Sequence, residues 1–433
     1  MSVRRWYIYI CLGFLFCIWS KPLAWGQTDV KFPHTPFSAY LPSDSIFAHY
    51  LHRKGIPITR NNAITILSSG SQKFQYLFQD VAKAQHLIHM EYFNFRNDSI
   101  AKLLFQHVEA RVKDSVKVRA MYDDFGNMSN NRPLRKKHLI DCNARGVELR
   151  PYDPIRFPFV NHLFHRDHQK IVVIDNQVAY TGGMNVADYY IHGTEAVGEW
   201  RDMHLRLEGQ VAIELQKAFL YTWNKESKQN ISMDSLLRVS PPTFDTQTDT
   251  LGGRVAIVQR IPRKTPEAIR EAYIAAIDAA EHTIQLINPY FTPTQSITKA
   301  LKRAIRRGVR VEIMLSEASD IPVTPDAAMY KAYRLHKQGA HIYIFRGGFH
   351  HSKILIVDGR FATVGSANLN ARSLRYDYEI NAFLFDLPAV AKLVDIFEKD
   401  KGNSYLLTQE TYRRKGFWKR MWRWAAHLLI PFL

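Results

Sequence analysis

The stretch that decides the fold is 168–175, HQKIVVID, which recurs at 351–358 as HSKILIVD. In both copies four aliphatic residues precede the final aspartate, and such a run predicts a short buried strand. The histidine and the lysine are two residues apart, so strand alternation places them on one face of the sheet. One copy would arise by chance in about one chain in twenty of this length, whereas two copies with matched surroundings are a strong signal.

The rest of the chain repeats in the same order, and this repeat defines the predicted domains. Strands that alternate with helical stretches indicate α/β units. We therefore predict an α/β fold of two pseudo-symmetric sandwich halves that share one active site at their interface. The matched segments are 84–95 with 280–291, 116–119 with 309–312, and 146–147 with 339–340. The predicted parts are a lead-in at 27–60, a first half at 61–226 with its motif region at 162–189, a linker at 227–253, and a second half at 254–408 with its motif region at 345–372.

Two histidines, two lysines and two asparagines, brought together at one interface, suit a single tetrahedral phosphate. Lysine ammonium groups and asparagine amides donate to the non-bridging oxygens and stabilise the charge that accumulates during transfer. One imidazole attacks phosphorus and forms a phosphohistidine, while the other protonates the leaving alkoxide and then deprotonates the acceptor. The residues predicted for these roles are His168, Lys170, His351 and Lys353, with Asn185 and Asn368 as phosphate-binding residues.

Four carboxylates belong to the same predicted arrangement. Asp202 and Glu379 follow the histidines of their own halves at similar distances, and a carboxylate behind each ring would fix its tautomer. Asp175 and Asp358 end the buried strands, where we expect structural ion pairs. This chemistry requires no metal ion and no cofactor.

A metal site is the alternative use of the histidines in the first motif region. It would rest on three histidines spaced by three residues, but clustered Cys or acidic ligands do not complete the set. These histidines are His162, His165 and His168.

Composition indicates a globular chain with a basic body. The 433 residues are 46% hydrophobic and 23% charged, which rules out a disordered chain, a collagen-like fibre and a polytopic membrane protein. The net charge of +18 suits a polyanionic partner, either nucleic acid or an anionic membrane. Composition alone does not choose between these two partners.

Both ends of the chain have features of membrane or export segments. Residues 1–26 combine Arg4 and Arg5 with an uncharged, mostly apolar run at 6–19, which predicts an export signal peptide or an N-terminal anchor. Residues 409–433 form a basic, tryptophan-rich tail with helical spacing, which predicts an amphipathic helix on a membrane surface. The alternative is a terminal helix docked on its own domain. The cations of the tail are Arg413, Arg414, Lys415, Lys419, Arg420 and Arg423, and its tryptophans are Trp418, Trp422 and Trp424.

The duplicated motif resembles that of the phospholipase D superfamily, and the match is closer to the bacterial cardiolipin synthases. The resemblance implies a phospholipase D-like fold, places Asp175 and Asp358 in the catalytic motif, and favours His168 as the nucleophile. It further implies a phosphatidyl transferase that condenses two phosphatidylglycerol molecules to cardiolipin and glycerol. We expect an exported, membrane-associated enzyme of the bacterial cell envelope. The resemblance covers roughly 60–433 and rests on 91–93, 122–124, 164–168, 180–185, 200–202, 288–291 and 364–369.

The chain departs from the family pattern in two places. Family members typically begin with two membrane-spanning helices, whereas this chain has one short export-like segment. At 370–374 the chain reads NARSL where the family usually has DNRSF.

Two other activities remain open from the sequence. They are a phospholipase D, in which water replaces the acceptor lipid, and an exported phosphodiesterase or nuclease of the same superfamily. A nucleic-acid partner is not expected, because the export signal and the tryptophan-rich tail suit an anionic phospholipid substrate and a membrane surface. The oligomeric state is left open.

Overall fold

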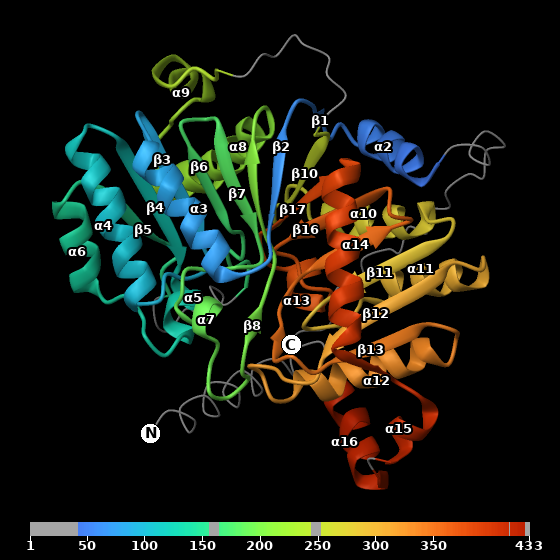
Figure 1. The fold of residues 1–433 in the computed structure, drawn as a ribbon. Helices are drawn as coiled ribbons and strands as arrows, with labels where there is room; N and C mark the ends of the chain where they lie inside the picture. The colour runs from blue at the N-terminus through green and yellow to red at the C-terminus, as the bar shows by residue number, and fades with distance from the viewer. Residues whose placement is uncertain (1–41, 156–163, 244–252, 415, 429–433) are drawn as a thin grey trace. The chain divides into compact units, whose positions relative to one another are not determined.

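Two β-sheets form the centre of the protein, one for each predicted half (Figure 1). The computed structural model describes residues 42–155, 164–243, 253–414 and 416–428. The first sheet has the strand order β2 (Ala63–Leu67), β9 (His204–Glu208), β7 (Val178–Gly182), β6 (Ile171–Ile174), β3 (Leu87–Tyr92), β4 (Lys117–Asp123) and β5 (Val147–Tyr152). The second has the order β1 (Ile58–Thr59), β10 (Val255–Arg260), β17 (Glu379–Leu384), β16 (Phe361–Gly365), β15 (Ile354–Val357), β11 (Thr283–Ile287), β12 (Arg310–Ser316), β13 (His341–Phe345) and β18 (Ser404–Leu406).

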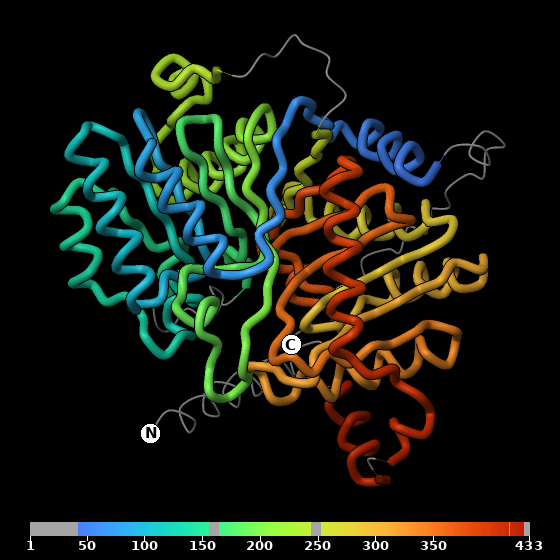
Figure 2. Tube along the Cα trace, in the orientation of Figure 1, coloured from blue at the N-terminus to red at the C-terminus, as the bar shows by residue number. Residues whose placement is uncertain are grey.

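The two sheets share one topology, which confirms the predicted duplication. In the first, β3, β4 and β5 are parallel, and β6, β7, β9 and β2 follow as antiparallel neighbours. The second sheet repeats this pattern from β11, β12 and β13 to β15, β16, β17 and β10. In Figure 2 the strands of the first sheet are coloured from blue to green, and those of the second, apart from the blue β1, from yellow to red. The motif strands β6 and β15 therefore hold equivalent central positions.

Helices connect the parallel strands and close the outer layers. Local signals set several helix starts: Ser69 accepts a hydrogen bond from the backbone N–H of Gln72, and Asp98 caps the next helix in the same way. The helices of the first half are α3 (Gly70–Lys83), α4 (Ser99–Lys113), α5 (Asp124–Ser129), α6 (Lys136–Ala144), α7 (Tyr189–His192) and α8 (Val211–Ser227). Those of the second half are α10 (Ala268–Ala279), α11 (Gln295–Arg306), α12 (Thr324–His336), α13 (Ala371–Arg375) and α14 (Leu387–Gly402).

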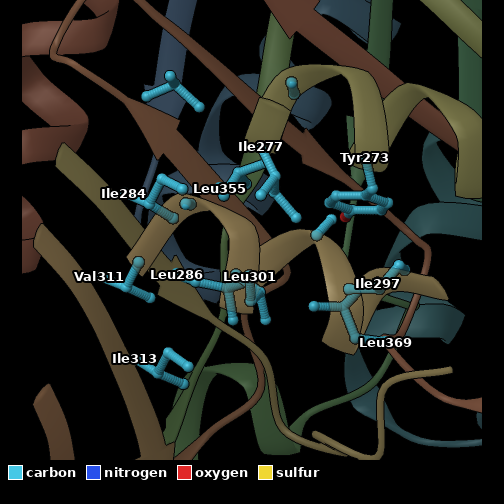
Figure 3. Packing of buried hydrophobic residues seen from close by; sticks show 14 of the residues in the cluster. Tyr273, Ile277, Ile284, Leu286, Ile297, Leu301, Val311, Ile313, Leu355 and Leu369 are labelled. Carbon is cyan, nitrogen blue, oxygen red and sulfur yellow. The ribbon is translucent and has the colours of Figure 1, made fainter. Parts of the chain in front are cut away.

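Apolar clusters lie on both faces of each sheet. One cluster packs the second sheet against α10 and α11, and Figure 3 shows its aliphatic side chains around Leu286 and Leu301. Another contains residues of both sheets together with α8 and α14, including Val173 of β6 and Ile356 of β15. Burial of shared apolar surface is non-directional and favourable, so this cluster holds the halves together and fixes the two motif strands relative to each other.

Two segments outside the predicted halves are more structured than the sequence indicated. The lead-in contains α2 (Ser43–Arg53), whose Phe47 packs in the core of the second half, and β1 pairs with β10 of the second sheet. The linker contains the short helix α9 (Met233–Val239). The predicted signal or anchor at 1–26 lies outside the described residues. Among the helices that are described, none has the length and apolar character needed to cross a bilayer.

The tail forms the predicted helix, and one side of it docks on the second half. The described part of the tail contains α15 (Gln409–Arg414) and α16 (Gly416–Leu428). Asp326 at the start of α12 pairs with Lys419 at 2.8 Å and with the buried Arg423 at 3.4 Å, and Ala426 packs against Ala327. The opposite side is aromatic and open. Its exposed fractions are 63% for Phe417, 74% for Trp418, 43% for Met421, and 51% each for Trp422 and Trp424.

Candidate active site

Two short parallel strands from opposite halves place His351 beside a carboxylate. β8 (Trp200–Arg201) pairs in parallel with β14 (Phe349–His350). The backbone N–H of His351 donates to the carbonyl of Arg201 at 2.7 Å, which brings His351 next to Asp202. The Nδ1 of His351 then lies 2.7 Å from Oδ2 of Asp202.

A matching parallel bridge positions His168. Asp167 bridges Tyr378, and the backbone N–H of His168 donates to the carbonyl of Tyr378 at 3.0 Å. Its Nδ1 lies 3.0 Å from Oε1 of Glu379, the next residue along. The expectation that each histidine pairs with the carboxylate of its own half is therefore wrong. The pairs are crossed because each histidine strand hydrogen-bonds to the carboxylate strand of the other half.

Burial and nearby cations hold both imidazoles toward the neutral form. Burial, Lys170, Lys353 and His351 hold the pKa of His168 well below its usual range. Burial and Lys353 also lower the pKa of His351, but the adjacent Asp202 carboxylate opposes that shift. His168 is held further toward the neutral form than His351, because Lys170 and Lys353 both lower its pKa, whereas Asp202 raises that of His351.

The two orienting carboxylates have different environments. The pKa of Asp202 is lowered, because Lys353 and His351 outweigh the effect of its complete burial. Burial raises the pKa of Glu379 to about 7, although Lys170 and a hydrogen bond from the Ser366 hydroxyl oppose the rise. Of the two carboxylates, Asp202 is therefore the one held in its ionised form, and its negative charge stabilises a positive charge on His351.

Both motif lysines are buried in the same site. Burial lowers the pKa of Lys170 to about 7 and that of Lys353 to about 8. Glu379 and Asp202 oppose the shift at both lysines, so the charges of the two halves act on one another. The Nζ of Lys353 lies 3.0 Å from Nε2 of His351, as same-face placement predicted. A bound phosphate anion would favour the charged form of both lysines.

The asparagines lie at the small-residue turns that follow β7 and β16. Asn185 and Asn368 are buried, and among the described residues their Oδ1 atoms have no hydrogen-bond partner. The preceding glycine positions are closely packed. A Cβ at Gly183 would collide with the Asp202 carboxylate, and one at Gly365 with Asn381, so only glycine permits these approaches.

Asp175 and Asp358 do not belong to this site. They follow the four-residue motif strands, which separates them from their histidines by about 23 Å of extended chain. Asp175 accepts backbone N–H donors from residues 85–87 at 2.7 to 2.8 Å, and Asp358 does the same for residues 281–283 at 2.7 to 2.9 Å. This geometry does not agree with the catalytic role that the resemblance implied for Asp175 and Asp358. It also does not agree with the ion pairs that we expected for them. Their role is structural, and their partners are backbone amides.

The sequence reasoning missed several residues around the rings. Lys73 of α3 is fully buried, and its Nζ donates to the carbonyls of Met184 at 3.2 Å and Asn185 at 2.9 Å. Phe93 meets the His168 ring edge-on at 5.0 Å, and Tyr290 meets His351 at 5.8 Å. Lys73 could have been found from the sequence, because it is a lysine at a position of an amphipathic helix where an apolar residue is expected. The aromatic residues follow β3 and β11, in stretches that had been matched as repeats and as part of the family resemblance but had been given no role in the site.

Two of the three histidines of the metal alternative, His165 and His168, lie in the described part of the chain. The Nδ1 of His165 lies 2.9 Å from the carbonyl of Tyr376, to which it donates. His162 falls outside the described part of the chain. Within that part, no group of three His, Cys, Asp or Glu side chains is arranged to hold a metal ion.

Comparisons with known proteins identify the family of this chain. A family model described as cardiolipin synthase, PLD-like domain, matches residues 77–219 and 273–401, one segment in each half. This chain belongs to that family. A cardiolipin synthase of Listeria welshimeri is 33% identical over 404 residues, which are 93% of this chain and 82% of the relative. Cardiolipin synthase 2 of Staphylococcus epidermidis is 33% identical over 385 residues, 88% of this chain and 77% of the relative.

A solved structure extends the agreement to the fold. The phosphatidylserine synthase of Haemophilus influenzae superposes with a TM-score of 0.68 at 13% identity, covering 90% of this chain and 100% of that chain. At such low identity the likeness concerns the fold alone. The membership of the phospholipase D superfamily and the cardiolipin synthase-like character that the motifs indicated are confirmed, and the hydrolase and nuclease alternatives are not favoured.

Proposed function

We propose that this enzyme is a phosphatidyl transferase that condenses two phosphatidylglycerol molecules into cardiolipin and glycerol. The observation that carries the proposal is the crossed pairing of His168 with Glu379 and of His351 with Asp202, which gives the two rings different tendencies to hold a proton. Two histidines that differ in this way can take different roles, one as the nucleophile and the other as the general acid. The identity to cardiolipin synthases over most of the chain supports the choice of lipid.

In the first step His168 is the nucleophile. A hydrogen bond between Nδ1–H and Glu379 leaves the Nε2 lone pair free to attack phosphorus. The bond from phosphorus to the glycerol oxygen breaks, and His351 transfers its Nε2 proton to that oxygen, so glycerol leaves neutral. Asp202 supports the protonated ring before transfer. Lys170, Lys353 and the two asparagine amides stabilise the charge on the non-bridging oxygens.

In the second step the roles of His351 reverse. The terminal hydroxyl of a second phosphatidylglycerol gives its proton to the now neutral His351 and attacks the phosphohistidine. The bond between phosphorus and His168 breaks, which returns both rings to their starting states and releases cardiolipin. His351 is buried and the His168 side chain is only 15% exposed, which limits access of water to the intermediate and favours transfer over hydrolysis.

The place of action that we propose is the surface of an anionic membrane. The exposed aromatic side of α16 supports this assignment, because tryptophans settle at the boundary between headgroups and acyl chains. Export to the cell envelope remains our proposal from residues 1–26.

The decisive experiment incubates the full chain with liposomes of labelled phosphatidylglycerol and separates the lipid products. We expect cardiolipin and glycerol in equal amounts, and enzyme quenched with denaturant at neutral to alkaline pH, where the phosphorus–nitrogen bond survives, should carry labelled phosphate on His168. His168→Ala and His351→Ala should each abolish turnover, while His282→Ala, which changes an exposed histidine, should retain it. Phosphatidic acid as the main product would make the enzyme a hydrolase, and substantial turnover by either folded active-site variant would contradict the shared site.

A further inference from the structure

A cavity of about 420 Å³ lies between α11 and α12, outside the catalytic site. It is large enough for a lipid headgroup, since small-molecule pockets begin at about 300 Å³. The loop that follows β11 connects it to the active site, because Tyr290 of that loop meets His351 and Pro293 lines the cavity. The lining residues are Pro293, Gln295, Thr298, Lys299, Lys302, Lys331, Arg334 and Leu335.

The charged residues of this cavity are all cationic. Two come from α11, Lys299 and Lys302, and two from α12, Lys331 and Arg334. No carboxylate in the described part of the chain forms an ion pair with any of the four. The next basic residue on α11 behaves differently, because Arg303 pairs with Asp278 at 2.5 Å. Burial and the nearby Arg334 lower the pKa of Lys331, so these cations already repel one another.

The tail helix lies beside this cavity. Arg334 sits over the ring of Tyr330 at 5.9 Å, and that ring meets His427 of α16 edge-on at 4.6 Å. Burial, Lys331 and Arg334 lower the pKa of His427, which reflects how close the end of the tail lies to the cavity cations. The aromatic side of the same helix is open to the surroundings, led by Trp418 at 74% exposure.

We propose that this cavity binds the phosphate headgroup of an anionic phospholipid while the aromatic side of α16 enters the membrane surface. Four cations without carboxylate partners match the charge of phosphodiester groups, and α16, which carries the exposed tryptophans, packs against α12, one of the two helices that line the cavity. The headgroup bound here is not the one that reacts, because no catalytic residue lines the cavity. The inference rests on the proposed function only in taking an anionic membrane as the place of action.

The test compares two charge-matched variants of the full chain. Lys299→Gln/Lys302→Gln removes two cavity cations from the outer side of α11, and Lys102→Gln/Lys137→Gln removes two exposed cations from the first half. Binding is measured by co-sedimentation with vesicles of phosphatidylglycerol and phosphatidylcholine, and with vesicles of phosphatidylcholine alone. We expect the cavity variant to bind phosphatidylglycerol vesicles about tenfold more weakly, and the control variant to bind within about twofold of the unaltered chain.

Turnover of a short-chain soluble phosphatidylglycerol separates this site from the catalytic one. We expect both double variants to keep it, and their circular dichroism spectra to match that of the unaltered chain. Equal losses of vesicle binding in the two variants would reduce the effect to net charge and overturn the site, as would no loss in either. Lys331→Gln, from the other helix, should repeat the result of the cavity variant if the first one folds poorly.

A titration with inorganic phosphate distinguishes a headgroup site from a site for free phosphate. We expect no saturable binding at millimolar phosphate, and tight binding that the cavity variant abolishes would overturn the lipid assignment. Absence of cardiolipin production, by contrast, would refute the proposed function and leave the vesicle result standing. The two failures are therefore distinguishable.

Discussion

The Nδ1 of His168 lies 3.0 Å from Oε1 of Glu379, a residue of the other half of the chain. The same relation holds in reverse for His351 and Asp202, at 2.7 Å. Neither half therefore contains a complete histidine–carboxylate pair. Assembly of the two halves creates the pairs, which links catalytic competence to the apolar cluster shared by the two sheets.

The crossed pairs predict unequal effects on the pH profile. Asp202→Asn and Glu379→Gln should each lower kcat by about 10²- to 10⁴-fold, as expected when a histidine loses its orienting group. Asp202 raises the pKa of His351, so its removal lets the ring lose its proton at lower pH. The alkaline limb of the kcat profile should then move to lower pH in Asp202→Asn. A profile of kcat against pH in both variants measures this, and an unmoved alkaline limb would contradict His351 as the acid.

Sequence reasoning reached the duplicated fold and both His-x-Lys pairs because these depend on local periodicity and on repetition. It did not reach the partner of each histidine. Asp202 and Glu379 follow their own histidines at similar spacing, yet the pairing depends on which strands meet across the interface, and spacing within one chain does not encode that. The role of Asp175 was missed for a similar reason, because its partners are the backbone amides of a distant strand start.

The pKa values of the two active-site lysines predict that substrate binding weakens as pH rises. Lys170 and Lys353 have pKa values of about 7 and about 8 in the free enzyme, so each loses its positive charge as pH increases through its own value. The apparent KM for a short-chain phosphatidylglycerol should therefore rise between about pH 7 and pH 9. Because bound phosphate raises both pKa values, kcat should fall only at higher pH.

The matched control for this titration is arginine, which stays charged throughout the range. Lys353→Arg should flatten the rise in KM above about pH 8, whatever its effect on kcat. Initial rates over a range of substrate concentrations at each pH separate the two parameters. A KM that is constant with pH in the unaltered enzyme would show that the lysines do not titrate in this range.

We predict that replacing Asp358 lowers the stability of the fold without lowering the catalytic rate. Asp358→Asn weakens three hydrogen bonds to the backbone N–H groups of residues 281–283, and we expect the free energy of unfolding to fall by about 2 to 4 kcal/mol. The kcat of the folded fraction should stay within a few-fold. Urea unfolding and initial rates test the two parts, with the exposed Asp395→Asn as the control. A kcat loss of about 10²-fold or more with unchanged stability would restore Asp358 to the catalytic set.

The cationic site predicts turnover without a metal ion. Lys170, Lys353 and the two asparagine amides supply the stabilisation that Mg²⁺ supplies in many phosphoryl-transfer sites. Activity on a soluble substrate should survive exhaustive dialysis against EDTA, and metal analysis of the active protein should find no stoichiometric ion. Loss of activity that one equivalent of a metal restores would instead favour a site at His162, His165 and His168.

The tail helix predicts that membrane binding and docking can be separated. Changing Trp418, Trp422 and Trp424 together to Ser leaves the contacts of Lys419 and Arg423 with Asp326 in place. Binding to phosphatidylglycerol vesicles should fall by at least about tenfold, because the groups that enter the headgroup boundary are gone. Turnover of a soluble short-chain substrate should change little, since the tail contributes no catalytic group.

Asp326→Asn makes the complementary change. It removes the carboxylate that holds Lys419 and Arg423 but keeps the tryptophans, so α16 should loosen from α12 and become more sensitive to limited proteolysis. Because two of the six tail cations are then released from their ion pairs, vesicle binding at low salt should hold or increase, and raising the salt concentration should weaken it. Unchanged vesicle binding in the tryptophan variant, together with unfolding of the Asp326 variant, would make the tail a structural element of the second half.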